Sequence, residues 1–80
     1  MKIKLTVFAR LSDFFDRERE LELPSGARIS DAMELLAAEV PAARPVLDSC
    51  RAALGETFVE LDTPLEAGAE LFLLPPSSGG

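Results

Sequence analysis

The chain has 80 residues, 48% of them hydrophobic and 28% charged, with a formal net charge of -6 at pH 7. A chain of this length folds as one small domain. Its acidic balance argues against binding to nucleic acid or to an anionic membrane, because phosphate groups select basic surfaces. The charge is instead typical of a protein that docks on a basic partner, or it serves solubility alone. No apolar run reaches the roughly 20 residues that span a bilayer. The first residues alternate like a strand instead of forming a signal peptide. We therefore expect a cytoplasmic protein.

Reactive side chains are scarce in this sequence. It contains no histidine, and Cys50 is its one cysteine. An internal disulfide or a multi-cysteine metal site is therefore excluded, and we expect no metal site and little capacity for acid–base catalysis near neutral pH. Because Cys50 lacks the histidine that usually activates a cysteine nucleophile, we expect it to be structural.

The first third of the chain predicts a β-hairpin. Residues 2–9 and 17–23 both alternate with a period of two, which indicates half-buried strands. Between them, residues 11–16 are typical of a short helical turn, and Pro24 to Gly26 then ends the second strand with turn residues. Two strands joined by a tight connection form a hairpin. Its inward-facing residues are expected to be Ile3, Leu5, Val7, Leu21 and Leu23, with Phe14 and Phe15 at one end of the core.

A helix is predicted to follow the hairpin. Ser30 is its expected N-cap, and Asp31 and Glu34 lie in the first turn, where negative charge suits the helix dipole. Pro41 ends the helix, because the residue before a proline avoids the α region. The apolar stripe of this helix consists of Ile29, Ala32, Met33, Leu36 and Val40, widened by Leu35.

The second half of the chain predicts three further strands. Residues 41–49 form a connection with a helical turn around Val46 and Leu47. Strands are expected over residues 51–54, 57–61 and 70–74.

The resulting order, β-β-α-β-β-β, belongs to the α+β class. It predicts a mixed sheet of about five strands packed on one main helix. Residues 1–74 are expected to form this domain, and residues 75–80 a flexible tail.

The last strand is apolar on both faces. Leu71 and Leu73 are expected to face the helix, so Phe72 and Leu74 point the other way, and one helix covers one face only. Phe8 also lies opposite the core residues of its own strand. We therefore expect an exposed patch, which is typical of a protein interface, unless the connection over residues 41–49 covers it. The patch residues are Phe8, Phe58, Phe72 and Leu74.

The tail combines two prolines with two glycines. Pro75 and Pro76 favour an extended start and cannot extend a sheet edge, because they lack N–H groups. Gly79 and Gly80 have no side chains, so they are able to enter a slot too narrow for other residues. The four residues after the prolines reach about 13 Å at roughly 3.3 Å each, which is enough to enter a pocket of a partner.

Several motifs together resemble a known family, the MoaD-type sulfur carriers that form the small subunit of molybdopterin synthase, in the MoaD/ThiS group with a ubiquitin-like β-grasp fold. The sequence departs from the family in two turns: Gly55 stands where Asn is frequent, and Ala69 where Asp is. We expect these departures to affect only local turn stability. The motifs that carry the resemblance are Val7–Leu11, Thr57–Val59 before Thr63–Leu65, Gly68–Leu71 and, most specifically, Leu74–Gly80.

The resemblance implies a mechanism in which Gly80 accepts sulfur. A ubiquitin-activating-type (MoeB-type) adenylyltransferase would use MgATP to adenylate the Gly80 carboxylate, and a persulfide donor would replace AMP to give a thiocarboxylate. The large (MoaE-type) subunit would bind the tail, in a heterotetramer, and use the sulfur to convert cyclic pyranopterin monophosphate to molybdopterin. The domain itself would bind no cofactor and would not be catalytic alone. The resemblance places apolar contacts with the large subunit at Phe8, Phe58 and Leu74; the wider partner-binding surface that we expect adds Phe72, Pro75 and Pro76.

Other functions remain open at this point. A sulfur carrier for thiamin synthesis or tRNA thiolation, and a ubiquitin-like modifier joined to lysines through Gly80, need the same activated terminal glycine. A plain interaction domain with an idle tail is the fourth alternative. The doubled proline favours the molybdopterin carrier by resemblance.

Overall fold

The first two strands form an antiparallel hairpin, as their alternation predicts. The computed structural model describes residues 1–76. In it, β1 (Lys2–Val7) pairs with β2 (Glu18–Glu22) in a register that places Ile3 opposite Leu21. Both side chains are buried, so the inner face of the hairpin is the predicted one.

The connection between these strands is a short 3-10 helix, η1 (Ala9–Asp13). Strand β1 ends at Val7, earlier than predicted, because Ala9 has a φ of 52° and turns the chain out of the sheet. Phe15 is buried at the end of the core, and Phe14 packs against it partly exposed. The two aromatic residues therefore close the core as expected.

The main helix, α1 (Ile29–Glu39), begins one residue before the expected N-cap. The prediction for Ser30 is wrong: the N-cap is Arg28, whose backbone N–H donates to the Asp31 carboxylate at 2.8 Å. Ser30 lies inside the first turn, and its backbone N–H donates to the Leu61 carbonyl at 2.8 Å. The Asp31 carboxylate thus satisfies the N–H of the N-cap residue itself, and its negative charge suits the start of the helix.

The buried stripe of α1 differs from the predicted one at its edges. Leu35, which was expected to widen the stripe, is 36% exposed, whereas Ala37 is buried. Val40 follows the helix and is partly buried. A narrower stripe suffices because α1 packs on a single sheet face. The residues that α1 buries are Ile29, Ala32, Met33, Leu36 and Ala37.

The connection after α1 is helical. It consists of η2 (Pro41–Ala43) and a short helix, α2 (Arg44–Asp48). The expected turn around Val46 and Leu47 is this second helix, and both residues are buried in the same core as α1.

The remaining strands complete a five-stranded mixed sheet. They are β3 (Arg51–Leu54), β4 (Thr57–Val59) and β5 (Glu70–Leu74), and the sheet order is β2-β1-β5-β3-β4. Strand β5 lies in the centre, parallel to β1 and antiparallel to β3. Strand β4 ends at Val59 and is shorter than predicted. The next two carbonyls are used outside the sheet: the Glu60 carbonyl accepts from the Thr63 N–H at 3.1 Å, and the Leu61 carbonyl accepts from the Ser30 N–H of α1.

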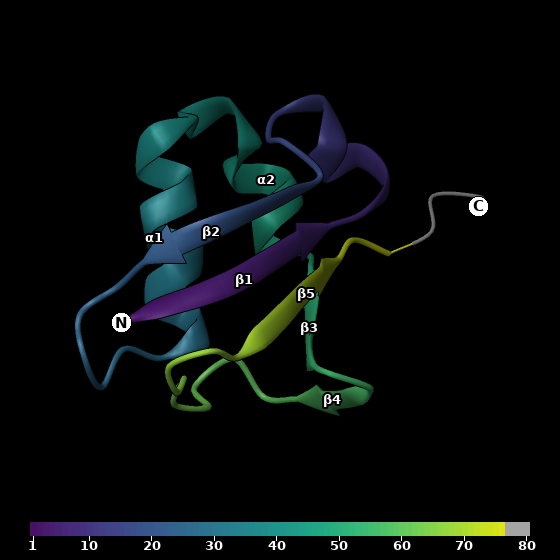
Figure 1. Cartoon of the computed structure of the whole chain (residues 1–80). Helices are drawn as coiled ribbons and strands as arrows, with labels where there is room; N and C mark the ends of the chain where they lie inside the picture. The colour runs from purple at the N-terminus through teal and green to yellow at the C-terminus, as the bar shows by residue number, and fades with distance from the viewer. Residues whose placement is uncertain (77–80) are drawn as a thin grey trace.

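The helices cover one face of the sheet only. Figure 1 shows α1 and α2 on the same side, behind the strands. Between the two layers lies a single core, whose fully buried large residues are Ile3, Leu5, Val7, Leu11, Leu21, Ile29, Leu36, Leu47, Leu71 and Leu73. No helix within residues 1–76 is long and apolar enough to cross a membrane.

Candidate functional site

The open face of the sheet carries the apolar side chains that the alternation of β5 predicts. Leu71 and Leu73 are completely buried, whereas Phe72 and Leu74 are only partly buried. Phe72 is paired with Thr6 of β1 on one side and with Ala53 of β3 on the other, and Ala53 is paired in turn with Phe58 of β4. Directly paired residues point to the same face, so an apolar row crosses these strands.

Four side chains on this open face form what we call the apolar patch: Phe8, Phe58, Phe72 and Leu74. The Phe8 and Phe72 ring centroids lie 6.1 Å apart with the rings tilted by 32°. All four residues line an open hollow of about 200 Å³, together with Ala53, Gly55 and Glu56. Phe58 is 53% exposed, and the other three members are partly buried. The structure therefore brings together the four residues that the sequence singled out.

The connection over residues 41–49 does not cover this patch. Its buried residues Ala43, Val46 and Leu47 pack into the core with α1, on the other face of the sheet. Within residues 1–76, the chain thus leaves an apolar surface open to solvent, which is the arrangement typical of an interface.

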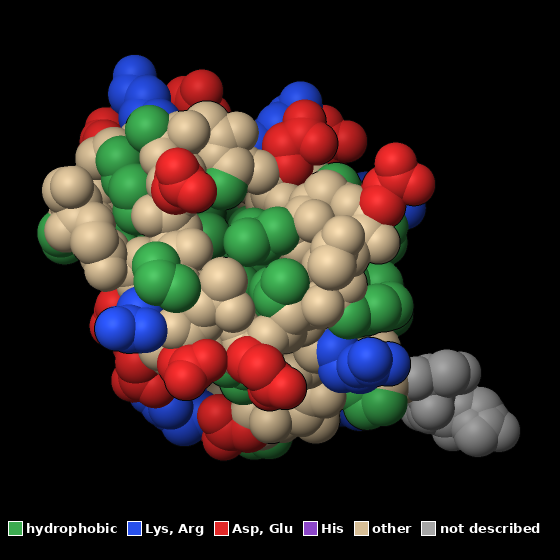
Figure 2. All heavy atoms as spheres, turned by 90° about the horizontal axis from the view of Figure 1, so that it is seen from below, with side chains coloured by type: hydrophobic (Ala, Val, Ile, Leu, Met, Phe, Trp, Pro, Cys, Tyr) green, Lys and Arg blue, Asp and Glu red, His purple; other side chains and the backbone are tan. Residues whose placement is uncertain are grey.

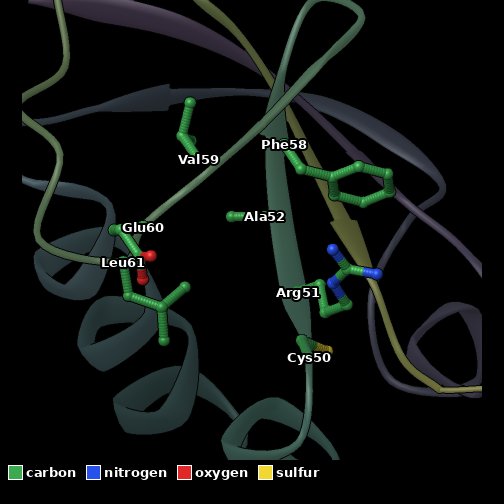
Figure 3. Close-up of a pocket in the computed structure, with 7 residues that line it drawn as sticks. All are labelled: Cys50, Arg51, Ala52, Phe58, Val59, Glu60 and Leu61. Carbon is green, nitrogen blue, oxygen red and sulfur yellow. The ribbon is translucent and has the colours of Figure 1, made fainter.

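Two arginines accompany the patch, and the sequence analysis did not single them out. The guanidinium carbon of Arg51 lies 4.1 Å from the centroid of the Phe58 ring, and that of Arg17 lies 5.8 Å from the Phe8 centroid. Figure 3 shows the Arg51 guanidinium beside the Phe58 ring, pointing away from Val59. The sequence contained a signal for Arg51. Side chains two residues apart in a strand point to the same face, so Arg51 shares the open face with Ala53.

The glycine in the turn between β3 and β4 explains one departure from the family pattern. Gly55 has a φ of 60°, in the left-handed region that glycine and asparagine tolerate best. Its N–H also donates to the Glu70 carbonyl at 3.0 Å. Either residue type is therefore compatible with this turn beside the patch.

A second hollow, of about 500 Å³, lies where the chain leaves β4 and separates from the start of β3 (Figure 3). Cys50 lines it, but its Sγ donates to the Val46 carbonyl at 3.2 Å and the residue is buried. Burial raises the pKa of the Cys50 thiol to about 11, so the thiolate is scarce at neutral pH. This environment agrees with a structural Cys50. Within residues 1–76 no three His, Cys, Asp or Glu side chains come close enough to hold a metal ion.

The base of the tail lies beside the apolar patch. Pro75 and Pro76 follow Leu74 directly and lie outside the sheet, Pro75 partly buried and Pro76 exposed. Gly79 and Gly80, the predicted working residues, lie outside the described residues.

These features define a class of protein: a ubiquitin-like β-grasp domain whose open sheet face carries an apolar surface next to its C-terminal segment. A crystal structure of SAMP1 from Haloferax volcanii superposes with a TM-score of 0.84 at 26% identity over 100% of both chains. A putative molybdopterin converting factor subunit 1 from Pyrococcus furiosus superposes with a TM-score of 0.82 at 27% identity, over 95% of this chain and 98% of that chain.

The sequence comparison is more specific. The model of the ThiS family matches residues 5–80. A molybdopterin synthase sulfur carrier subunit from Chlamydomonas reinhardtii is 32% identical over 83 residues, which covers 100% of both proteins. The chain belongs to the ThiS family, which confirms the recognised resemblance and the β-grasp fold.

Proposed function

We propose that the chain is the sulfur-carrier subunit of a molybdopterin synthase, with the Gly80 carboxylate as its working group. The observation that carries this proposal is the apolar patch at the end of β5, beside Pro75 and Pro76. It occurs in a chain that is 32% identical to a molybdopterin synthase sulfur carrier subunit over its full length.

The chemistry follows from the weakness of a carboxylate as an electrophile. An adenylyltransferase of the ubiquitin-activating type uses MgATP to convert the Gly80 carboxylate into an acyl-adenylate, with release of pyrophosphate. The outer sulfur of a persulfide donor then displaces AMP and forms an acyl disulfide. A thiol reduces this disulfide, which releases the thiocarboxylate at Gly80 and leaves a disulfide on the donor side. The sequence has no glycine-rich loop followed by Lys and Ser or Thr that would cradle phosphates, so the nucleotide belongs to the partner enzyme.

The chain's own contribution is recognition and delivery. The apolar patch docks on the large synthase subunit, and Pro75 and Pro76 stay outside the sheet because they cannot join its hydrogen-bond ladder. The paired glycines allow the terminal group to enter the partner's active site, where two transfers complete the dithiolene of molybdopterin. The carrier is a non-catalytic subunit in this scheme.

Intact mass spectrometry tests the proposal directly. The full chain is incubated with the adenylyltransferase, MgATP, a persulfide donor and a thiol reductant, with a reaction lacking ATP as the control. We expect one sulfur-for-oxygen exchange, which fragmentation places at Gly80, and formation of molybdopterin when the large subunit and cyclic pyranopterin monophosphate are added. A chain that gains no sulfur under these conditions would contradict the proposal.

A ubiquitin-like modifier is the second candidate. The reason is that SAMP1 is the small archaeal modifier protein 1, and its structure superposes on this chain with a TM-score of 0.84. This function joins the Gly80 carboxylate to lysine amines instead of to sulfur. The same mass measurement on protein recovered from cells separates the two: covalent adducts with other proteins favour the modifier, and a terminal thiocarboxylate favours the carrier.

A further inference from the structure

The open face of the sheet is divided into two regions of different charge. On the β1–β2 side, Lys2 is paired with Glu22, and Lys4 lies between Glu20 of β2 and Glu70 of β5. Three glutamates meet two lysines in these pairings, so this region is net acidic. Solvent screens such exposed charges.

The patch side is different because two arginines contact its aromatic rings. Within residues 1–76, Arg17 and Arg51 form no ion pair, whereas Arg19 pairs with Glu39 and Arg44 with Glu34. Figure 2 shows hydrophobic side chains at the right-hand edge of the molecule with Lys or Arg atoms directly beneath them. A chain with a net charge of -6 therefore presents two arginines against the rings of its apolar patch, and Glu56 is the charged residue that lines the hollow itself.

The Arg51 guanidinium is also held in place. It lies 4.1 Å from the Phe58 centroid, in the range of a cation–π contact. One planar face is thereby covered by the ring, while the N–H groups at the edge remain available. A guanidinium that is already ordered loses less entropy when it binds a carboxylate through two parallel hydrogen bonds.

We propose that Arg51, supported by Phe58, is a specificity-determining contact that takes a carboxylate of the partner protein, and that Arg17 provides a second, weaker contact beside Phe8. The surface that binds the patch is then apolar and flanked by Asp or Glu, not by the basic residues that the net charge predicts. Glu56 is the acidic residue that lines the hollow. Its charge repels a partner carboxylate placed next to it, and this repulsion sets the orientation of the partner on the patch. The identity of the partner, the large synthase subunit, rests on the proposed function.

Charge reversal with a matched control tests this inference. Arg51→Glu and Arg44→Glu change the net charge equally, but Arg44 belongs to α2 on the other face of the sheet. We expect Arg51→Glu to weaken binding to the large subunit at least about tenfold, mainly through the association rate at low salt, and Arg44→Glu to have a much smaller effect. Thermal unfolding of both variants verifies that they fold. Equal effects of the two variants would overturn the inference, because the contribution would then be one of net charge only.

A cross-linking experiment identifies the partner's group. Arg51→Lys places an amine at this position, and a carbodiimide joins amines to carboxylates that lie in ion-pair contact. We expect a cross-link from position 51 to an Asp or Glu of the large subunit that the wild-type chain does not form, and reversal of that acidic residue to Lys to restore binding by Arg51→Glu. A complex with no such cross-link and no rescue contradicts the inference and leaves the proposed function intact. A wild-type chain that binds no large subunit overturns both.

Discussion

Leu74, the last residue of β5, is paired with Arg51, the first residue of β3. This pairing places a cation next to the point where the chain leaves the sheet toward Pro75. Phe58 lies on the other side of Arg51, with its ring beside the guanidinium. An apolar anchor, a fixed charge and the base of the tail therefore meet within three neighbouring strands.

Replacement of Phe58 by Asp is expected to weaken binding to the large subunit without unfolding the domain. Phe58 is 53% exposed, so its loss costs little core packing, and surface substitutions usually change stability by about 0.5 kcal/mol or less. A central aromatic anchor typically contributes about 2 kcal/mol or more to binding. Leu35→Asp is the matched control, because Leu35 is 36% exposed on α1. Calorimetric titration measures both affinities, and unchanged binding by Phe58→Asp would remove the patch from the interface.

Leu71 and Phe72 are expected to differ in their effects although they are adjacent in β5. Leu71→Ala removes a completely buried side chain and should lower the free energy of unfolding by about 2–5 kcal/mol. Phe72 is only partly buried on the open face. Phe72→Ala should therefore lower the free energy of unfolding by less than Leu71→Ala does, and should weaken binding to the partner by more. Urea unfolding and titration with the large subunit check the two outcomes. A larger loss of stability for Phe72→Ala would mean that the open face belongs to the core.

Deletion of Gly80 is expected to abolish sulfur acceptance while leaving the unfolding temperature unchanged. Terminal residues generally add few packed contacts, and the proposed chemistry needs the carboxylate at this exact chain length. Ser78→Ala, which retains both glycines, is the control and should accept sulfur normally. Mass spectrometry and thermal unfolding are measured on the same samples. A deletion that unfolds the domain would assign the tail a structural role instead.

The Cys50 thiol is expected to react slowly in the native protein. Its pKa is raised to about 11 by burial, so at pH 8 only about one thiol in a thousand is ionised, compared with about a quarter for an ordinary thiol of pKa near 8.5. A coloured disulfide reagent should therefore modify Cys50 much faster in concentrated urea than in buffer. Fast native modification, or loss of sulfur transfer in Cys50→Ala with the fold intact, would indicate a functional cysteine.

The local sequence predicted most of the elements because short-range physics decides them. The period of two in β1, β2 and β5 and the stripe of α1 follow from which residues face the core. The errors are tertiary in origin. The helix starts before Ser30, where the backbone N–H groups of Ile29 and Ser30 donate to the distant carbonyls of Thr63 and Leu61. Strand β4 stops at Val59, because the same Leu61 carbonyl is used by α1.

The sequence by itself determined the fold class, the two apolar faces of the last strand and the candidate tail, since composition and alternation are properties of neighbours along the chain. Only the tertiary structure decided that Phe8, Phe58, Phe72 and Leu74 share one hollow and that Arg51 rests on Phe58. The physical reason is the strand order. Because β5 lies between β1 and β3, residues separated by most of the chain become neighbours on one face.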